Sequence, residues 1–207
     1  MILHPHVTGV VLAGGRARRM GGADKTKLPV PGGGSRTTLD RILEVFNQRF
    51  AECVMVTAAP GESGPRAELA ACAGLRVRMT ADRFAGCGPL GGIHAALCAV
   101  TTRFAFVCGC DMPALSGPLL DQMARRVQEG RLLVPVVRGR PEPLHAFYPV
   151  SCLPETERAL RDGVRMMLDF FERVPIDYLS DSEFADVPGA GRSFDNINTP
   201  EDLEALR

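Results

Sequence analysis

The chain has 207 residues, of which 45% are hydrophobic and 23% charged, and its 24 Lys and Arg residues balance 24 Asp and Glu residues. This size and composition predict a single globular domain over residues 1–207 that buries a substantial core. The zero net charge argues against a general nucleic-acid binder, which needs a basic excess, and no apolar run approaches the roughly 20 residues of a membrane span.

Seven cysteines, an odd number, are spread through segments of core-like composition. Cys108 and Cys110 are separated by one residue, whereas structural zinc sites usually have about two to four residues between paired ligands. We therefore interpret the cysteines as small buried side chains rather than as a disulfide framework or a metal centre. The first residues lack the charged region and cleavage site of a signal peptide, so we expect a cytoplasmic protein.

Strand and helix patterns alternate along the chain. The β-branched run at 7–12 ends in glycines and predicts a buried strand, and apolar residues at helical spacing predict a helix over 38–50. Ser116 is a predicted N-cap, and Gly130 is the predicted end of the same helix. The other expected elements are strands at 53–57, 75–79, 104–108, 132–137, 144–150 and 176–179, a glycine-rich loop at 84–92, and helices at 66–72, 91–100, 116–129, 153–161, 164–173 and from Thr199 onward.

This alternation is typical of βαβ units. It predicts a Rossmann-like α/β fold in which a mainly parallel sheet is flanked by helices on both faces. In such sheets the ligand lies in the crevice beyond the carboxyl ends of the strands. The functional residues are therefore expected in the loops that follow the strands.

The segment LAGGRARRMGGADK, residues 12–25, directly follows the first strand. Its glycines allow a close backbone approach and present N–H groups to anions, and four basic residues stand among them against a single acid. We interpret it as a phosphate-binding loop; the alternative is a glycine-rich turn with solvated arginines. The segment is neither a Walker A motif nor the dinucleotide G-x-G-x-x-G motif.

Two acids follow neighbouring elements of the pattern. Asp82 comes after the third predicted strand and Asp111 after the fourth, so parallel strands bring both to the same edge of the sheet. Carboxylates that face a phosphate-binding loop are typical of a magnesium site, because Mg²⁺ bridges carboxylate and phosphate oxygens. Either aspartate alone is also compatible with a helix cap or a turn.

The segment at 12–25 resembles the signature of the sugar-nucleotide-type nucleotidyltransferases. The later segments CGPLGGIHAAL, FVCGCDMP, PEPLHAFY and SFDNINTPEDL resemble the molybdenum cofactor guanylyltransferases, which join GMP from GTP to molybdopterin. The resemblance runs from about Val7 to Leu206. It implies a nucleotidyltransferase that uses Mg²⁺ and releases pyrophosphate.

The resemblance also implies roles for individual residues. Gly15 and Arg19 match the phosphate-facing part of the loop, and Lys25 matches the lysine that contacts the phosphates. Lys27 stands where relatives have an aliphatic residue, which leaves open whether it shares this role. The segment whose backbone holds the nucleotide corresponds to Leu12, Ala13 and Gly14.

Further roles follow from the same resemblance. Asp82 matches an acid that contacts the nucleotide, and Asp111 matches the magnesium ligand, which makes Lys25, Arg19 and Asp111 the implied catalytic residues. Asn196 and Asn198 match asparagines near the pterin substrate. The expected partners are GTP, molybdopterin and molybdoenzyme-maturation proteins, with no nucleic acid or membrane and with a monomer or weak oligomer as the state of the chain.

Several alternatives remain open at this level. A related cytidylyltransferase or sugar-nucleotide enzyme shares the loop and the acids, and a non-catalytic nucleotide-binding adaptor shares the fold. His94 is interpreted as a packing residue, and His145 either packs or lines the pterin pocket. Arg138 and Arg140 flank a turn and either contact the pterin phosphate or are solvated. His4 and His6 lie in a terminus that we expect to be mobile.

Overall fold

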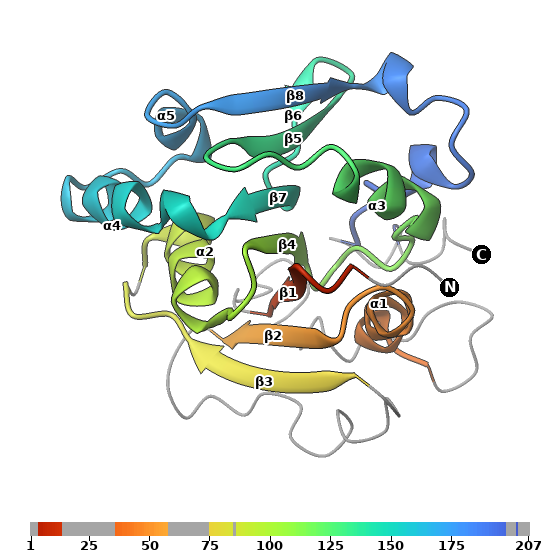
Figure 1. Cartoon of the computed structure of the whole chain (residues 1–207), viewed down its shortest axis with the longest axis horizontal. Coiled ribbons are helices and arrows are strands. Elements are labelled where there is room, and N and C mark those ends of the chain that lie inside the picture. Colours follow the sequence, from red (N-terminus) through yellow and green to blue (C-terminus); the bar gives the residue numbers. More distant parts are fainter. Residues whose placement is uncertain (1–3, 14–35, 58–74, 85, 198–201, 203–207) are drawn as a thin grey trace.

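The structure, a computed structural model, describes residues 4–13, 36–57, 75–84, 86–197 and 202. These residues form one eight-stranded sheet in the order β3-β2-β1-β4-β7-β5-β6, with β8 paired to β5 (Figure 1). The strands are β1 (Val7–Leu12), β2 (Glu52–Thr57), β3 (Arg76–Ala81), β4 (Phe104–Gly109), β5 (Leu132–Val137), β6 (Arg140–Pro141), β7 (His145–Pro149) and β8 (Ile176–Ser180). The α-helices are α1 (Thr38–Asn47), α2 (Gly88–Ala99), α3 (Gly117–Ala124), α4 (Leu153–Arg161) and α5 (Met167–Phe171).

The strands β3, β2, β1 and β4 are parallel to one another, as the βαβ pattern predicts. Strand β7 is antiparallel to both of its neighbours, β4 and β5, and β8 is parallel to β5. Because two antiparallel steps restore the direction, the carboxyl ends of β5 and β8 lie at the same edge as those of β1 to β4. The predicted α/β fold with a mainly parallel sheet is confirmed, although the sequence did not predict the direction of β7.

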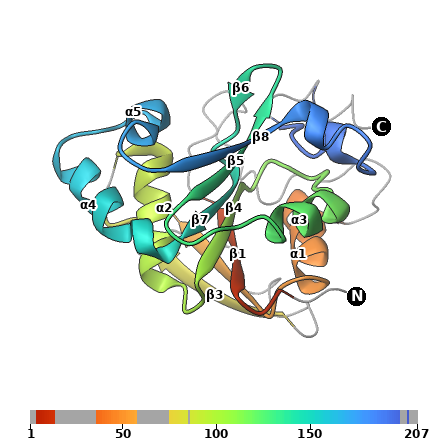
Figure 2. The same cartoon turned by 45° about the horizontal axis from the view of Figure 1, so that its top comes forward.

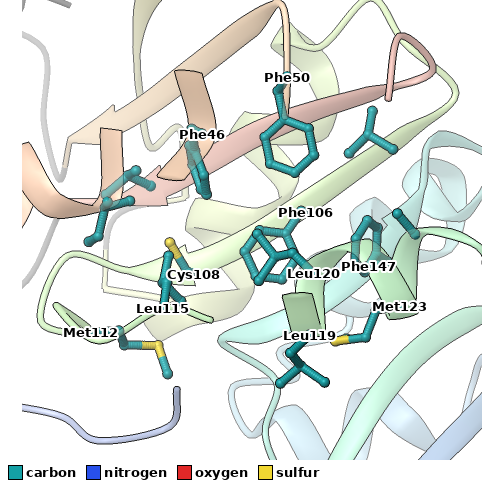
Figure 3. Packing of buried hydrophobic residues seen from close by; sticks show 14 of the residues in the cluster. Phe46, Phe50, Phe106, Cys108, Met112, Leu115, Leu119, Leu120, Met123 and Phe147 are labelled. Atoms are coloured by element: carbon teal, nitrogen blue, oxygen red, sulfur yellow. The ribbon is translucent and has the colours of Figure 1, made fainter. Parts of the chain in front are cut away.

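Helices cover both faces of the sheet (Figures 1 and 2). One core lies under α1 and α3, where Phe46, Phe50, Phe106 and Phe147 pack together with the side chains of α3 (Figure 3). The other core lies under α2, α4 and α5, and its strand residues include Val10 and the last residue of β1. Consecutive residues of the central strands therefore point into two different cores, which explains why these strands are apolar along their whole length.

Four helices differ in their bounds from the sequence prediction. Helix α1 ends at Asn47 and not at residue 50. Helix α2 begins at Gly88, with Pro89 in its first turn, so residues 88–90 are helical rather than part of a loop. Helix α3 has the predicted cap, because the Ser116 hydroxyl accepts from the Leu119 N–H, but it ends at Ala124 and not near Gly130. Helix α5 occupies only the middle of the predicted 164–173. The predicted helix at 66–72 and the start of the helix at Thr199 lie outside the described residues.

The expectation of a mobile N-terminus is wrong for His4, which is only 5% exposed. Its Nε2 atom lies 3.0 Å from an Asp121 carboxylate oxygen in α3, and its backbone N–H donates to the Arg49 carbonyl at 2.7 Å. Arg49 in turn contacts the same carboxylate at 3.1 Å. These contacts fasten the start of β1 to the end of α1 and to α3.

None of the described helices is long and apolar enough to cross a membrane. The six cysteines among the described residues are free thiols, and five of them are buried. Burial raises the pKa of the Cys108 thiol well above its usual value, so this thiol stays protonated. Among the described residues there is also no cluster of three or more His, Cys, Asp and Glu side chains. The interpretation of the cysteines as buried core residues is confirmed for these five, and it is wrong for Cys98, which is exposed.

We expect Gly9→Ala to destabilise the fold, because β1 passes so close to α1 at this point that a Cβ atom would lie 2.4 Å from a ring carbon of Phe46. Overpacking of this kind typically costs about 1–3 kcal/mol. Urea unfolding of the variant should show this loss with an unchanged slope. An unchanged midpoint would mean that α1 shifts without cost.

Candidate functional site

The residues singled out by the sequence lie at the carboxyl edge of the sheet. Leu12 ends β1, Asp82 directly follows β3, and Asp111 is two residues beyond β4. The predicted meeting of these strand ends at one edge follows from the parallel register of β1 to β4. Five members of the predicted site lie outside the described residues: Gly14, Gly15, Arg19, Lys25 and Asn198.

The end of β1 is fixed from three sides. The Ala13 N–H donates to the Val56 carbonyl at 2.8 Å, and the Leu12 carbonyl accepts from the Cys110 N–H at 3.3 Å. The Leu12 side chain packs against α2, because a Cβ atom on Gly92 would lie only 3.3 Å from it. The residues that begin the expected phosphate-binding loop therefore start from a rigid position between β2 and β4.

Asp82 is held at the first turns of α2. Its N–H donates to the Thr57 carbonyl at 2.9 Å, and its Oδ1 atom accepts from the Phe84 N–H at 2.7 Å. Burial raises the pKa of the Asp82 carboxyl, while the Phe84 N–H and then His94 act in the opposite direction. This carboxylate is partly desolvated, as expected of an acid that accepts hydrogen bonds from a ligand.

Asp111 lies on the loop between β4 and α3 and is partly exposed. Its Oδ1 atom folds back over Gly109, where a Cβ atom would lie 2.5 Å away. Its carbonyl accepts from the Ile197 N–H at 2.8 Å, so the backbone of this acid is bound by a segment 86 residues later (197 − 111 = 86). The segment at 193–197, which we call the closing segment, therefore reaches the expected metal ligand.

The two acids sit apart along the edge. Strands β2 and β1 separate β3 from β4, and at the usual spacing of roughly 4.8 Å per strand this places their ends about 14 Å apart. A single Mg²⁺ bound directly by both carboxylates does not fit this separation. Asp111 is thus the candidate ligand, and its single hard oxygen donor fits a magnesium ion whose other ligands are nucleotide phosphates and water.

Glycines position both acids, which the sequence analysis did not foresee. A Cβ atom on Gly91 would lie 2.6 Å from Asp82 Oδ2, just as one on Gly109 would displace Asp111. A bare hydrogen is therefore required beside each carboxylate. The sequence did contain a signal, in the segments CGPLGG and CGCD. Gly91 lies within a helix and Gly109 at the end of a strand, and in both places another residue type would stabilise the local structure more than glycine does.

The closing segment is anchored by a buried polar network. The Ser193 hydroxyl accepts from the Ser116 N–H at 2.9 Å and lies 2.7 Å from His145 Nε2. The Ser116 hydroxyl donates to the Pro188 carbonyl at 2.6 Å. His145 is fully buried, and burial lowers its pKa to about 4, so it is neutral at pH 7. It holds the closing segment through its contact with Ser193.

The predicted pterin residues divide between described and undescribed positions. Asn196 is exposed, and its side-chain amide donates to the Phe194 carbonyl at 3.3 Å. Asn198 lies outside the described residues. His94 packs edge-to-face on Phe84 with 4.9 Å between the ring centroids, in agreement with its interpretation as a packing residue.

Comparison with known proteins identifies the family. Residues 9–176 match the model of the MobA-like NTP transferase domain. The chain belongs to this family. It is accordingly a nucleotidyltransferase, which confirms the resemblance found in the sequence.

Relatives match over nearly the whole chain. The molybdenum cofactor guanylyltransferase of Desulfosudis oleivorans is 30% identical over 96% of this chain and 93% of its own length. A protein of Pelotomaculum thermopropionicum named "Probable molybdenum cofactor guanylyltransferase" is 35% identical over 97% of this chain and 91% of its own. The structure of molybdopterin-guanine dinucleotide biosynthesis protein A from Archaeoglobus fulgidus has a TM-score of 0.76 and 28% identity, and covers 96% of both chains.

We expect Gly91→Ala to lower activity by about tenfold or more, because it displaces the Asp82 carboxylate and weakens its contact with the ligand. In an Asp82→Ala background the same substitution has no carboxylate to displace. It should then stabilise α2 by about 0.5–1 kcal/mol, the usual gain of Ala over Gly in a helix. A double-mutant cycle on melting temperature and turnover measures this coupling. Additive effects in the cycle would show that Gly91 does not position Asp82.

We expect His145 to make stability depend on pH. Its pKa is lowered from 6.5 to about 4 in the folded state, so the unfolded chain binds the additional proton as the pH falls below 6.5, and the folded state loses stability. Between pH 7 and pH 5 this amounts to about 2 kcal/mol. Urea unfolding of His145→Gln should lack that part of the loss. An identical pH dependence in the variant would contradict the assignment.

Proposed function

We propose that the chain transfers GMP from GTP to molybdopterin, forming the guanine dinucleotide cofactor and pyrophosphate. The observation that carries the proposal is the match of about 200 residues to relatives named molybdenum cofactor guanylyltransferase. The placement of Asp111 at the sheet edge supports it because the residue that binds its carbonyl, Ile197, directly follows Asn196 in the chain.

The reaction proceeds by direct displacement. A terminal phosphate oxygen of molybdopterin attacks the α-phosphorus of GTP, the bond from that phosphorus to the bridging α–β oxygen breaks, and pyrophosphate leaves with the electron pair. Catalysis then depends on in-line positioning and on neutralising charge. No covalent enzyme intermediate is needed.

The residues have separate tasks in this proposal. The backbone of Leu12, Ala13, Gly14 and Gly15 binds the nucleotide, and Asp82 contacts it from the side of α2. Lys25 and Arg19 neutralise the departing pyrophosphate. Asp111 would hold Mg²⁺, which when bound supplies positive charge at the α-phosphate. Asn196 and Asn198 bind the pterin.

The compartment and the assembly state are part of the same proposal. A cytoplasmic location agrees with the free thiols described above, because thiols persist in that reducing compartment, and it places the enzyme where GTP is available. A single domain is supported by the one continuous sheet. We propose a monomer or weak oligomer that passes its product to molybdoenzyme-maturation proteins.

The proposal predicts that pyrophosphate is released with GTP and molybdopterin together, and much more slowly when CTP replaces GTP. Asp111→Asn should lose at least about a hundredfold in turnover, since it removes the charge that holds the metal. Asp169→Asn, an exposed carboxylate on α5, is the control and should retain full activity. Faster turnover with CTP would identify a cytidylyltransferase, and nucleotide binding without any pyrophosphate release would identify an adaptor.

A further inference from the structure

A cavity of about 410 Å³ opens beside the end of β5, at the same sheet edge as Asp111. Its walls include Val137 and Arg138 from the β5–β6 hairpin, Asp181 after β8, and the rings of Phe184 and Phe194. Both phenylalanines are less than 10% exposed, so they form a rigid apolar floor. A volume in the range of roughly 300–1,000 Å³ with few polar groups is typical of small-molecule sites.

The backbone of Arg138 is strained. Val137 pairs with Arg140 across a two-residue hairpin loop, and both loop residues have positive φ, 49° at Arg138 and 75° at Gly139. A turn of this kind favours Asn, Asp or Gly at its first position. Arg138 is the only non-glycine among the described residues with positive φ. Strain of this kind is concentrated at functional sites.

The polar groups of the cavity are available to a ligand. The Arg138 N–H donates to Asp181 Oδ2 at 3.3 Å, which fixes the carboxylate against the hairpin. Within the described part of the chain, the structure shows no ion pair for the Arg138 guanidinium and no other hydrogen bond to the Asp181 carboxylate. The cavity thus combines an apolar floor, a fixed carboxylate and an unpaired guanidinium.

The closing segment links this cavity to the reaction centre. Phe194 lines the cavity, and three residues later the Ile197 N–H binds the Asp111 carbonyl. Three residues span at most about 10 Å. A ligand that occupies the cavity therefore extends toward Asp111 along the same segment.

We infer that this cavity binds the heterocycle of the pterin acceptor, an inference that rests on the proposed function. Asp181 accepts hydrogen bonds from the ring N–H and the 2-amino group of the 2-amino-4-oxopyrimidine edge, and the Arg138 guanidinium donates to the 4-oxo group. Guanine has the same edge. The position of the cavity beyond Asp111, on the side away from β1, assigns it to the acceptor and not to the base of GTP.

The test measures the Kd of the full chain for 6-hydroxymethylpterin by fluorescence, and the KM for molybdopterin and for GTP separately. Arg138→Asn and Asp181→Asn should each weaken pterin binding and raise the molybdopterin KM about ten- to a hundredfold, the usual effect of losing a charge-assisted hydrogen bond. The KM for GTP should stay within twofold. Arg125→Asn and Asp186→Asn, which change exposed residues outside the cavity lining, are matched controls.

Two further readouts separate a binding role from a structural one. Arg138→Asn relieves the strained turn, so its melting temperature should be unchanged or higher while pterin binding falls. The wild type should prefer the pterin over 6-hydroxymethyllumazine, which lacks the 2-amino group, and Asp181→Asn should reduce that preference. Unchanged pterin binding in both variants, or a rise in the GTP KM alone, would overturn the inference. A wild type that neither binds the pterin nor converts molybdopterin would instead overturn the proposed function.

Discussion

The carboxyl end of β4 is the constraint on which the site depends. This strand is buried along its whole length and is paired with the parallel strand β1 on one side and the antiparallel strand β7 on the other. Its end therefore lies between β1, which precedes the expected phosphate-binding loop, and the part of the sheet near the closing segment. Asp111 stands at this boundary, with its side chain folded over Gly109 and its carbonyl bound to Ile197.

In the proposed function one edge of the sheet binds two different ligands, and the end of β4 is the boundary between them. On the side of β1 to β3, backbone groups and Asp82 face the position expected for a nucleotide. On the side of β5 and β8, the hairpin and the segment after β8 surround a cavity with an aromatic floor. The antiparallel direction of β7 does not prevent this arrangement. Because β7 is antiparallel to both β4 and β5, the strands β4 and β5 run in the same direction. Both halves thus present carboxyl ends at one edge.

Much of this architecture was predictable because local sequence patterns, such as apolar runs and helix caps, determine it. Apolar runs predicted seven of the eight described strands, and Ser116 predicted the start of α3. The direction of β7 was not predictable, since a strand buried on both faces has the same composition in either direction. The start of α2 was missed because its glycines look like a loop, whereas Gly91 is required by the packing of Asp82. Tertiary contact here outweighs local propensity.

The site residues, too, were predictable in some respects and not in others. The order of the strands placed Asp82 and Asp111 correctly at one edge, but their separation depends on the two strands between them. The sequence left the role of His145 open, because nothing in its neighbourhood shows that Ser193, far along the chain, supplies its partner. The β5–β6 cavity was not foreseen, since it combines residues from three separate segments.

The backbone hydrogen bond from Ile197 to Asp111 also has a consequence for folding during synthesis on the ribosome. Strands β1 to β4 are complete once residue 109 has been synthesised, but a domain generally folds as a unit. The segment that binds the Asp111 backbone emerges 86 residues after Asp111 (197 − 111 = 86). The backbone contact that holds Asp111 is therefore absent from a nascent chain until residue 197 has been synthesised, long after β4 itself is available.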